Sequence, residues 1–195
     1  MERFKQKRSL GAEVTFSSRS LNGRESPLSI LKVFLITGTQ KFPFDRLLRM
    51  TDALAEPGGI LAGADITAQS GTAGQQWKHI RCAPFLKADE MSRRIKEADL
   101  IITHGGTGSI IESLMAGRKV IAVPRLSAYG EHVDDHQKEI IAEFVSEGRV
   151  LAAENINDLR IAVQNSRDFT PKKWTGSREA MLKAVAEAIE GGGNS

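Results

Sequence analysis

Short runs of β-branched and other apolar residues, separated by stretches with helical spacing, constrain this chain more than any other feature. The runs at 32–37, 99–103 and 119–123 do not alternate between apolar and polar residues. Strands of this kind are buried on both faces, as in a parallel sheet that helices cover on either side. The sequence therefore predicts an α/β protein with a Rossmann-like parallel sheet and helices on both faces.

The same alternation sets the order of the elements and the extent of the folded domain. One domain should span residues 31–190, with residues 1–30 and 191–195 as disordered tails. Either Thr107 or Ser109 should cap the helix after the fourth strand. The expected strands are 32–37, 64–69, 77–83, 99–103, 119–123 and 149–151, and the expected helices are 44–54, 89–98, one from the cap to 117, 132–147, 155–163 and 176–189.

Charge and composition exclude two classes of protein. Residues 1–26 hold six basic and three acidic side chains, which account for the whole net charge of +3. The rest of the chain is balanced and lacks the basic excess with which proteins bind nucleic-acid backbones. No apolar run approaches the roughly 18 residues that a membrane-spanning helix needs. Because Cys82 is the single cysteine, no internal disulfide is possible, and a soluble cytoplasmic protein is expected.

A glycine-rich turn directly after the predicted strand 99–103 is the best candidate for a ligand site. Glycines let a ligand approach the backbone, and the free amides that open the next helix attract an anion such as a phosphate. A tight turn with no ligand would look the same. The spacing matches neither the dinucleotide fingerprint nor the Walker motif, whose lysine is missing, so an ATPase is disfavoured. The turn contains His104, Gly105, Gly106, Thr107, Gly108 and Ser109.

A carboxylate, Glu112, follows this turn in the first turns of the predicted helix. It is the polar exception among the apolar residues Ile110, Ile111 and Leu114. The favourable interaction of an acid with a helix start is one explanation for its position. A carboxylate beside a phosphate site is also suited to accept hydrogen bonds from the hydroxyls of a ribose.

The predicted helix 132–147 opens with a second group of polar candidates. Asp135, His136 and Gln137 offer hydrogen bonds to sugar hydroxyls, although a solvated acidic helix start would have the same sequence. His132 and His136 are spaced to share a helix face, as metal ligands do. No third ligand and no known metal-binding pattern accompanies them, so we expect no metal.

Two more pairs of candidate residues follow other predicted strands. Thr39 and Gln40 come after the first strand and could donate hydrogen bonds to a diphosphate, or form a plain turn. Phe85 and Leu86 come after the third strand and offer a flat apolar contact for a base, or belong to the core. Because the carboxyl ends of parallel strands share one edge of the sheet, all these groups should lie along that edge.

Together these features resemble the C-terminal donor-binding domain of glycosyltransferase family 28, the C-terminal half of a GT-B glycosyltransferase, whose best-known member is the peptidoglycan N-acetylglucosaminyltransferase. The chain is even more similar to the small stand-alone donor-binding subunits of two-component UDP-sugar transferases. These subunits act in dolichol-linked oligosaccharide assembly and in bacterial exopolysaccharide synthesis. The resemblance runs from Leu31 to about Ile189, and it rests on the strand and Gly-Thr loop 33–40, the run 98–109, Glu112, Ala116-Gly117, Pro124 and His136-Gln137.

The resemblance implies a role for each nucleotide-binding candidate. Glu112 would hold the uridine ribose, and the turn 106–109 together with Thr39 would hold the diphosphate. Phe85 and Leu86 would lie beside the uracil. No cofactor is implied.

The resemblance leaves the sugar open. Asp135 and Gln137 would face it, but Asp135 stands where the eukaryotic pattern usually has asparagine. An N-acetylglucosaminyl, glucosyl or glucuronosyl donor is therefore compatible with the sequence.

The resemblance also implies a second subunit. Two-domain transferases of this fold need about twice this length, and no acceptor-binding half is evident among the 195 residues. A membrane-anchored partner would supply the polyprenyl-linked acceptor and the general base, and would recruit this chain to the inner face of the cytoplasmic membrane. This chain would stabilise the departing diphosphate without a metal, and the transfer would invert the anomeric centre.

Two other functions stay open at this stage. A nucleotide-sugar-binding module without catalysis would need the same residues. A UDP-sugar epimerase shares the layer of strands and helices, but it should carry two domains in one chain, and the length argues against that.

Overall fold

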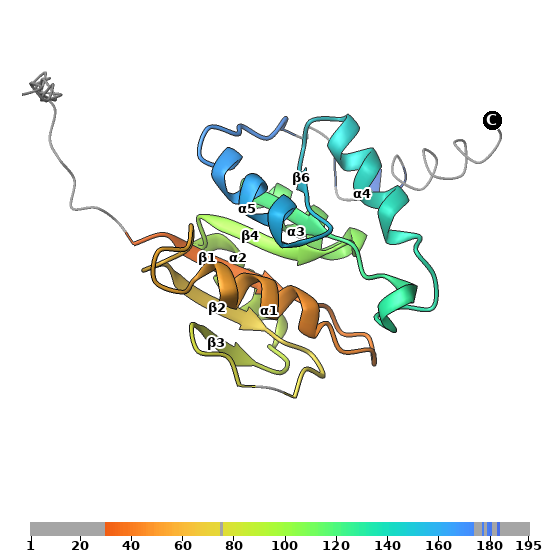
Figure 1. The fold of residues 1–195 in the computed structure, drawn as a ribbon. Helices are drawn as coiled ribbons and strands as arrows, with labels where there is room; N and C mark the ends of the chain where they lie inside the picture. Colours follow the sequence, from red (N-terminus) through yellow and green to blue (C-terminus); the bar gives the residue numbers. More distant parts are fainter. Residues whose placement is uncertain (1–29, 75, 174–176, 178, 181–182, 184–195) are drawn as a thin grey trace, which may run out of the picture.

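The computed structural model of the chain describes residues 30–74, 76–173, 177, 179–180 and 183. The predicted tails and the predicted helix 176–189 lie almost wholly outside these residues. Figure 1 shows a central sheet with helices on both of its faces. The expected Rossmann-like parallel α/β architecture is therefore confirmed.

In the described part of the chain, six parallel strands form one sheet in the order β3-β2-β1-β4-β5-β6. The chain builds outward from β1 to β3 and then crosses back to place β4 on the other side of β1. The connections therefore diverge between β1 and β4, and such a divergence opens a ligand-binding crevice at the carboxyl ends of the strands. The strands are β1 Lys32–Ile36, β2 Asp65–Gln69, β3 Ile80–Ala83, β4 Leu100–His104, β5 Lys119–Val123 and β6 Leu151–Ala152.

Helices cover each face of this sheet (Figure 1). On one face, α1 and α5 pack through residues such as Leu47 and Leu159. On the other face, α2, α3 and α4 pack through Ile95, Ile110 and Phe144. The bounds are α1 Asp45–Leu54, α2 Ala88–Glu97, α3 Thr107–Met115, a 3-10 turn at Ser127–Tyr129, α4 Gln137–Ser146 and α5 Ile156–Asn165.

The apolar runs of the sequence are explained by these two layers. In β1, Val33 and Leu35 belong to the core under α1 and α5. Phe34 and Ile36 belong to the core on the opposite face. Successive strand side chains point to opposite faces, so a strand covered on both sides needs apolar residues at every position.

The predicted cap of α3 is wrong. The residue before the helix is Gly106, in an extended conformation, and no side chain caps the helix start. Thr107 is already the first helical residue, and Ser109 lies further inside the helix. The amides that open α3 therefore keep their hydrogen-bonding capacity for another partner.

Helix α4 begins at Gln137, five residues later than predicted. The polar segment before it uses its side chains to bind nearby backbone amides. Asp135 Oδ1 accepts from the Ser127 amide at 2.8 Å, and Asp134 Oδ1 accepts from the His136 amide at 3.2 Å. Such local bonds compete with helix formation. The helix ends as expected before Gly148, which adopts a positive φ of 68°.

Candidate functional site

A cleft of about 440 Å³ lies at the carboxyl ends of β1, β2 and β4, bounded by the first turns of α2 and α3. It opens at the divergence between β1 and β4, where this sheet order favours a ligand. Half of the predicted site residues line it. They are Thr39, Leu86, His104, Gly106, Gly108, Ser109 and Glu112.

The remaining predicted residues lie off this wall. Phe85 is 55% exposed, so its alternative placement in the core is wrong. Asp135 and His136 are exposed on the segment before α4. The roles predicted for the whole group stay predictions. The group comprises Gln40, Phe85, Gly105, Thr107, Asp135, His136 and Gln137.

Three polar or flexible side chains on the wall were missed by the sequence reasoning. Gln69 ends β2, and Met91 and Ser92 lie on α2. A signal for the α2 pair was present, because the two residues precede the buried Ile95 by four and three positions. That spacing places them on the inward face of the helix.

His104 is buried at the end of β4, between the glycine-containing loops that follow β1 and β4. Its Nδ1 lies 3.2 Å from the carbonyl oxygen of Ile36. A carbonyl can only accept, so Nδ1 carries the hydrogen and Nε2 is left as an acceptor. Burial, with a smaller contribution from the charge of Arg125, lowers the pKa of His104 to about 4. The ring is therefore neutral at physiological pH.

The ring of His104 also sets the distance between the loops after β1 and β4. A Cβ atom at Gly106 would lie 2.2 Å from Nε2, and one at Gly38 would lie 2.8 Å from it. Gly38 has a positive φ of 89°. Glycine is needed at both positions because the backbones pass directly over the imidazole.

Gln137 performs a structural task that its place in the sequence did not suggest. Its Oε1 accepts from the amides of Gly105 and Arg125, each at 3.0 Å. The side chain is buried and joins the loops after β4 and β5 to the start of α4. These two bonds fix the backbone of the glycine-rich turn, so Oε1 already has its partners inside the protein.

The glycine-rich turn leaves room for a ligand at one position. A Cβ atom added at Gly108 would meet no atom within 4 Å. Gly108 is exposed, it lies in the first turn of α3, and that turn has no side-chain cap. Uncapped amides and the positive end of the helix dipole would favour an anion at this position.

A buried network of charged side chains supports the loops that follow β1 and β5. Arg125 is 1% exposed and donates to the carbonyl oxygens of Thr37, Phe42 and Glu131. Burial lowers the pKa of Arg125 to about 10, and the nearby Glu131 carboxylate opposes the shift. The guanidinium therefore stays charged while it holds the loop after β1 against the loop after β5.

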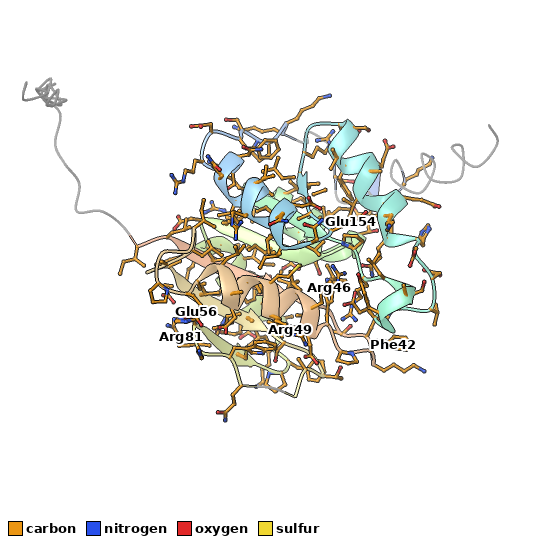
Figure 2. The ribbon with its side chains drawn as sticks, in the orientation of Figure 1. Phe42, Arg46, Arg49, Glu56, Arg81 and Glu154 are labelled. Atoms are coloured by element: carbon orange, nitrogen blue, oxygen red, sulfur yellow. The ribbon has the colours of Figure 1, made fainter. Side chains whose placement is uncertain are left out.

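Glu131 joins this network to helix α1. Its two carboxylate oxygens accept from Nε and one Nη of Arg46 at 2.9 and 2.8 Å. Figure 2 shows Arg46 at the end of α1 that faces Glu154, and Arg46 also donates to the Glu154 and Pro124 carbonyls. Loops that carry site residues are thus fixed to the body of the domain.

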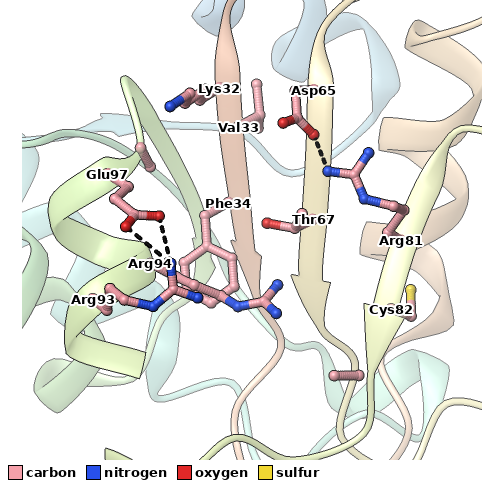
Figure 3. Close-up of a pocket in the computed structure, with 12 residues that line it drawn as sticks. Lys32, Val33, Phe34, Asp65, Thr67, Arg81, Cys82, Arg93, Arg94 and Glu97 are labelled. Atoms are coloured by element: carbon pink, nitrogen blue, oxygen red, sulfur yellow. Dashed lines mark hydrogen bonds and ion pairs between the residues drawn. The ribbon is translucent and has the colours of Figure 1, made fainter. Parts of the chain in front are cut away.

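Other hollows suit a nucleotide less well. A cleft of about 410 Å³ lies on the sheet face beside α2 (Figure 3). Its arginines are already in ion pairs, Arg81 with Asp65 and Arg93 with Glu97. A larger hollow of about 920 Å³ lies at the amino ends of the strands, the edge opposite the crevice. The carboxyl edge is therefore the candidate site.

The described residues include no group of three or more His, Cys, Asp or Glu side chains placed to hold a metal ion. His132 instead pairs with Asp134 at 3.0 Å, and His136 pairs with Glu139 at 3.3 Å. No helix within the described part of the chain is both long and apolar enough to span a membrane.

The sheet order and the cleft define a class of protein, the doubly wound parallel α/β domains, in which ligands bind at the carboxyl edge of the sheet. Residues 32–191 match the family described as the glycosyltransferase family 28 C-terminal domain. That span is most of the chain, so the chain belongs to this family. The resemblance inferred from the motifs is confirmed.

Two curated relatives carry the name UDP-N-acetylglucosamine transferase subunit ALG13. The Candida glabrata protein is 41% identical over 54 residues, which are 28% of this chain and 25% of the relative. The Yarrowia lipolytica protein is 24% identical over 105 residues, which are 53% of this chain and 52% of the relative. The matches thus span about half or less of the curated relatives.

Solved structures show the same fold at low identity. The solution structure of ALG13 has a TM-score of 0.58 at 19% identity and covers 85% of this chain and 100% of that one. MurG of Acinetobacter baumannii gives 0.54 at 20%, with 86% and 49% covered. A Listeria monocytogenes protein described as a candidate UDP-N-acetylglucosamine 2-epimerase gives 0.55 at 12%, with 89% and 50% covered. These likenesses confirm a GT-B type domain and concern the fold alone.

Proposed function

We propose that this chain is the UDP-sugar-binding subunit of a two-subunit inverting glycosyltransferase, which transfers a hexosyl residue to a polyprenyl-linked acceptor. The observation that carries the proposal is the meeting of the uncapped α3 start and Glu112 in one cleft at the carboxyl edge. Membership of the family and the names of the curated relatives support the transferase class.

The wall of the cleft offers a suitable contact for each part of uridine diphosphate. The amides of the turn 106–109 and the Thr39 hydroxyl suit the diphosphate, and Glu112 suits the ribose hydroxyls. Leu86 and Met91 supply apolar surface for the base. Amides held in place before the reaction stabilise a departing diphosphate without reorganisation and without a metal.

The general base is best supplied by a partner. The two titratable side chains on the described wall are His104 and Glu112. With a pKa of about 4, neutral His104 is a weak base for an acceptor hydroxyl. Glu112 is occupied by the ribose in this proposal. A membrane-associated subunit would then bring both the acceptor and the base to the open edge of the cleft.

Isothermal titration calorimetry of the full chain with UDP tests the nucleotide site. Glu112→Ala should weaken binding by about 10- to 100-fold, because hydrogen bonds to a charged group contribute about 1.5–3 kcal/mol. Glu97→Ala is a matched control, since Glu97 is an exposed glutamate outside the cleft. Equal affinities of wild type and Glu112→Ala for UDP would remove Glu112 from the site.

A UDP-sugar epimerase, which the sequence left open and which shares this fold, is the second candidate to test. The chain would be incubated with UDP-N-acetylglucosamine without acceptor and the sugar followed by NMR. A transferase subunit leaves the configuration at C2 unchanged. Formation of the C2 epimer would replace the transferase proposal.

A further inference from the structure

A single hydrogen bond joins α2 and α3 at the wall of the cleft. The Ser92 hydroxyl oxygen lies 2.7 Å from Oε1 of Glu112. Both side chains are half-buried, and both line the cleft. The same two residues line a neighbouring groove of about 430 Å³. The pair therefore belongs to the wall that the cleft and the groove share.

The chemistry of the pair fixes the direction of the bond. An ionised carboxylate carries no hydrogen, so Ser92 donates and Glu112 accepts. Charge-assisted bonds of this kind are short and strong. Within the described residues, Oε2 of Glu112 makes no hydrogen bond, and the Ser92 hydroxyl accepts none. Two acceptors thus remain available at the cleft.

The simplest alternative is that this bond only holds α2 against α3. The apolar contacts of Ile95, Ile110 and Ile111 already hold α2 and α3 to the sheet. A purely structural bond also gives no reason for the two unused acceptor atoms of Ser92 and Glu112 to remain at a cleft. A glutamate side chain loses rotamer entropy when it is fixed. Fixing it before the ligand arrives reduces the cost of binding.

We propose that Ser92 is a positioning residue for ribose recognition. Its hydroxyl holds the Glu112 carboxylate in the orientation that accepts hydrogen bonds from the ribose hydroxyls of the donor nucleotide. The inference rests on the proposed function, because it takes the ligand to be a uridine diphosphate sugar. It adds a residue of α2 to a ribose site otherwise centred on α3.

The test compares two ligands on each protein, UDP and 2′,3′-dideoxyuridine diphosphate, which lacks both ribose hydroxyls. Ser92→Ala in the full chain should weaken UDP binding about tenfold and leave the dideoxy affinity within about twofold. Selectivity for the ribose hydroxyls should therefore fall about tenfold. The ratio of two affinities measured on one sample does not depend on the fraction of folded protein, so partial destabilisation does not obscure the result.

Two further variants serve as controls. Ser92→Thr keeps the hydroxyl and should retain most of the selectivity. Ser146→Ala removes an exposed serine hydroxyl from α4 that bonds to the Glu143 carbonyl, and it should change neither affinity. Unchanged selectivity in Ser92→Ala, or an equal loss for both ligands, would overturn the positioning role while leaving the UDP site intact. Absence of UDP binding by the wild type would instead contradict the proposed function itself, and this inference with it.

Discussion

Two glycines of the same turn, Gly106 and Gly108, should respond in opposite ways to an added methyl group. Gly106→Ala places Cβ against the buried His104 ring, so it should lower the free energy of unfolding by about 1–3 kcal/mol. Gly108→Ala enters open space within a helix and should raise stability by up to about 1 kcal/mol. Urea denaturation measures both changes.

The open space at Gly108 makes the same variant a probe of the ligand. If the diphosphate lies at the α3 start, the Gly108→Ala methyl group occupies part of its place and should weaken UDP binding at least about tenfold. The variant is thus stable but impaired in binding. An unchanged UDP affinity would show that the diphosphate does not approach this residue.

The buried imidazole of His104 should make stability depend on pH below neutrality. Its pKa is lowered from 6.5 to about 4, so the unfolded chain binds a proton that the folded chain excludes between these values. The part of the free energy of unfolding that depends on neutral His104 is fully present above pH 6.5. It is lost as the pH falls, by about 2 kcal/mol at pH 5. His104→Asn keeps a donor for the Ile36 carbonyl and removes the titration. The difference in unfolding free energy between wild type and variant should therefore change between pH 7 and pH 5, and a constant difference would contradict this explanation.

At the scale of elements, the network around Glu131 should hold α1 to the loop after β5. Glu131→Ala removes the carboxylate that pairs with Arg46 and lies near the charge of the buried Arg125, so it should lower the free energy of unfolding by about 3–5 kcal/mol. Glu56→Ala, which breaks an exposed pair with Lys78, is the control and should have no comparable effect. Similar losses in both variants would mean that burial of the Glu131 pair contributes little.

The bounds of β5 were predicted correctly and the start of α4 was not, for a physical reason. β5 has the predicted bounds, because a strand buried on both faces must be apolar throughout. The start of α4 was misplaced because Asp134 and Asp135 are equally suited to a first helical turn and to bonds with nearby amides. Only the tertiary position of the Ser127 amide selects the second arrangement for Asp135.

The candidate site was predictable where a motif directly follows a strand. Gly106, Gly108, Ser109 and Glu112 line the cleft because they follow β4, which ends at the carboxyl edge. The tasks of Gln137 and Ser92 depend on contacts between different elements, across 32 and 20 residues of sequence. Spacing within one element carries no information about such contacts.

At the scale of the whole molecule, three exposed apolar side chains follow strands that end at the carboxyl edge. Phe85 follows β3, and Tyr129 and Val133 follow β5, with exposed fractions of 55%, 65% and 74%. Exposed apolar residues on the rim of a site often mark an interface. In the proposed function the acceptor reaches the donor sugar at this same edge, so a partner that carries the acceptor would contact these residues.

Activity should accordingly require a second component. Purified full chain, given labelled UDP-N-acetylglucosamine, UDP-glucose or UDP-glucuronate and a polyprenyl-linked acceptor, should bind nucleotide but transfer no sugar. Membranes from source cells that lack this gene should restore transfer from one of the donors when the purified chain is added. Glu112→Ala should fail to restore it.

Val133→Asp should bind UDP normally yet restore less transfer, because a charge on the rim opposes an apolar interface. Transfer by the purified chain alone would show that the acceptor site and the base belong to this chain.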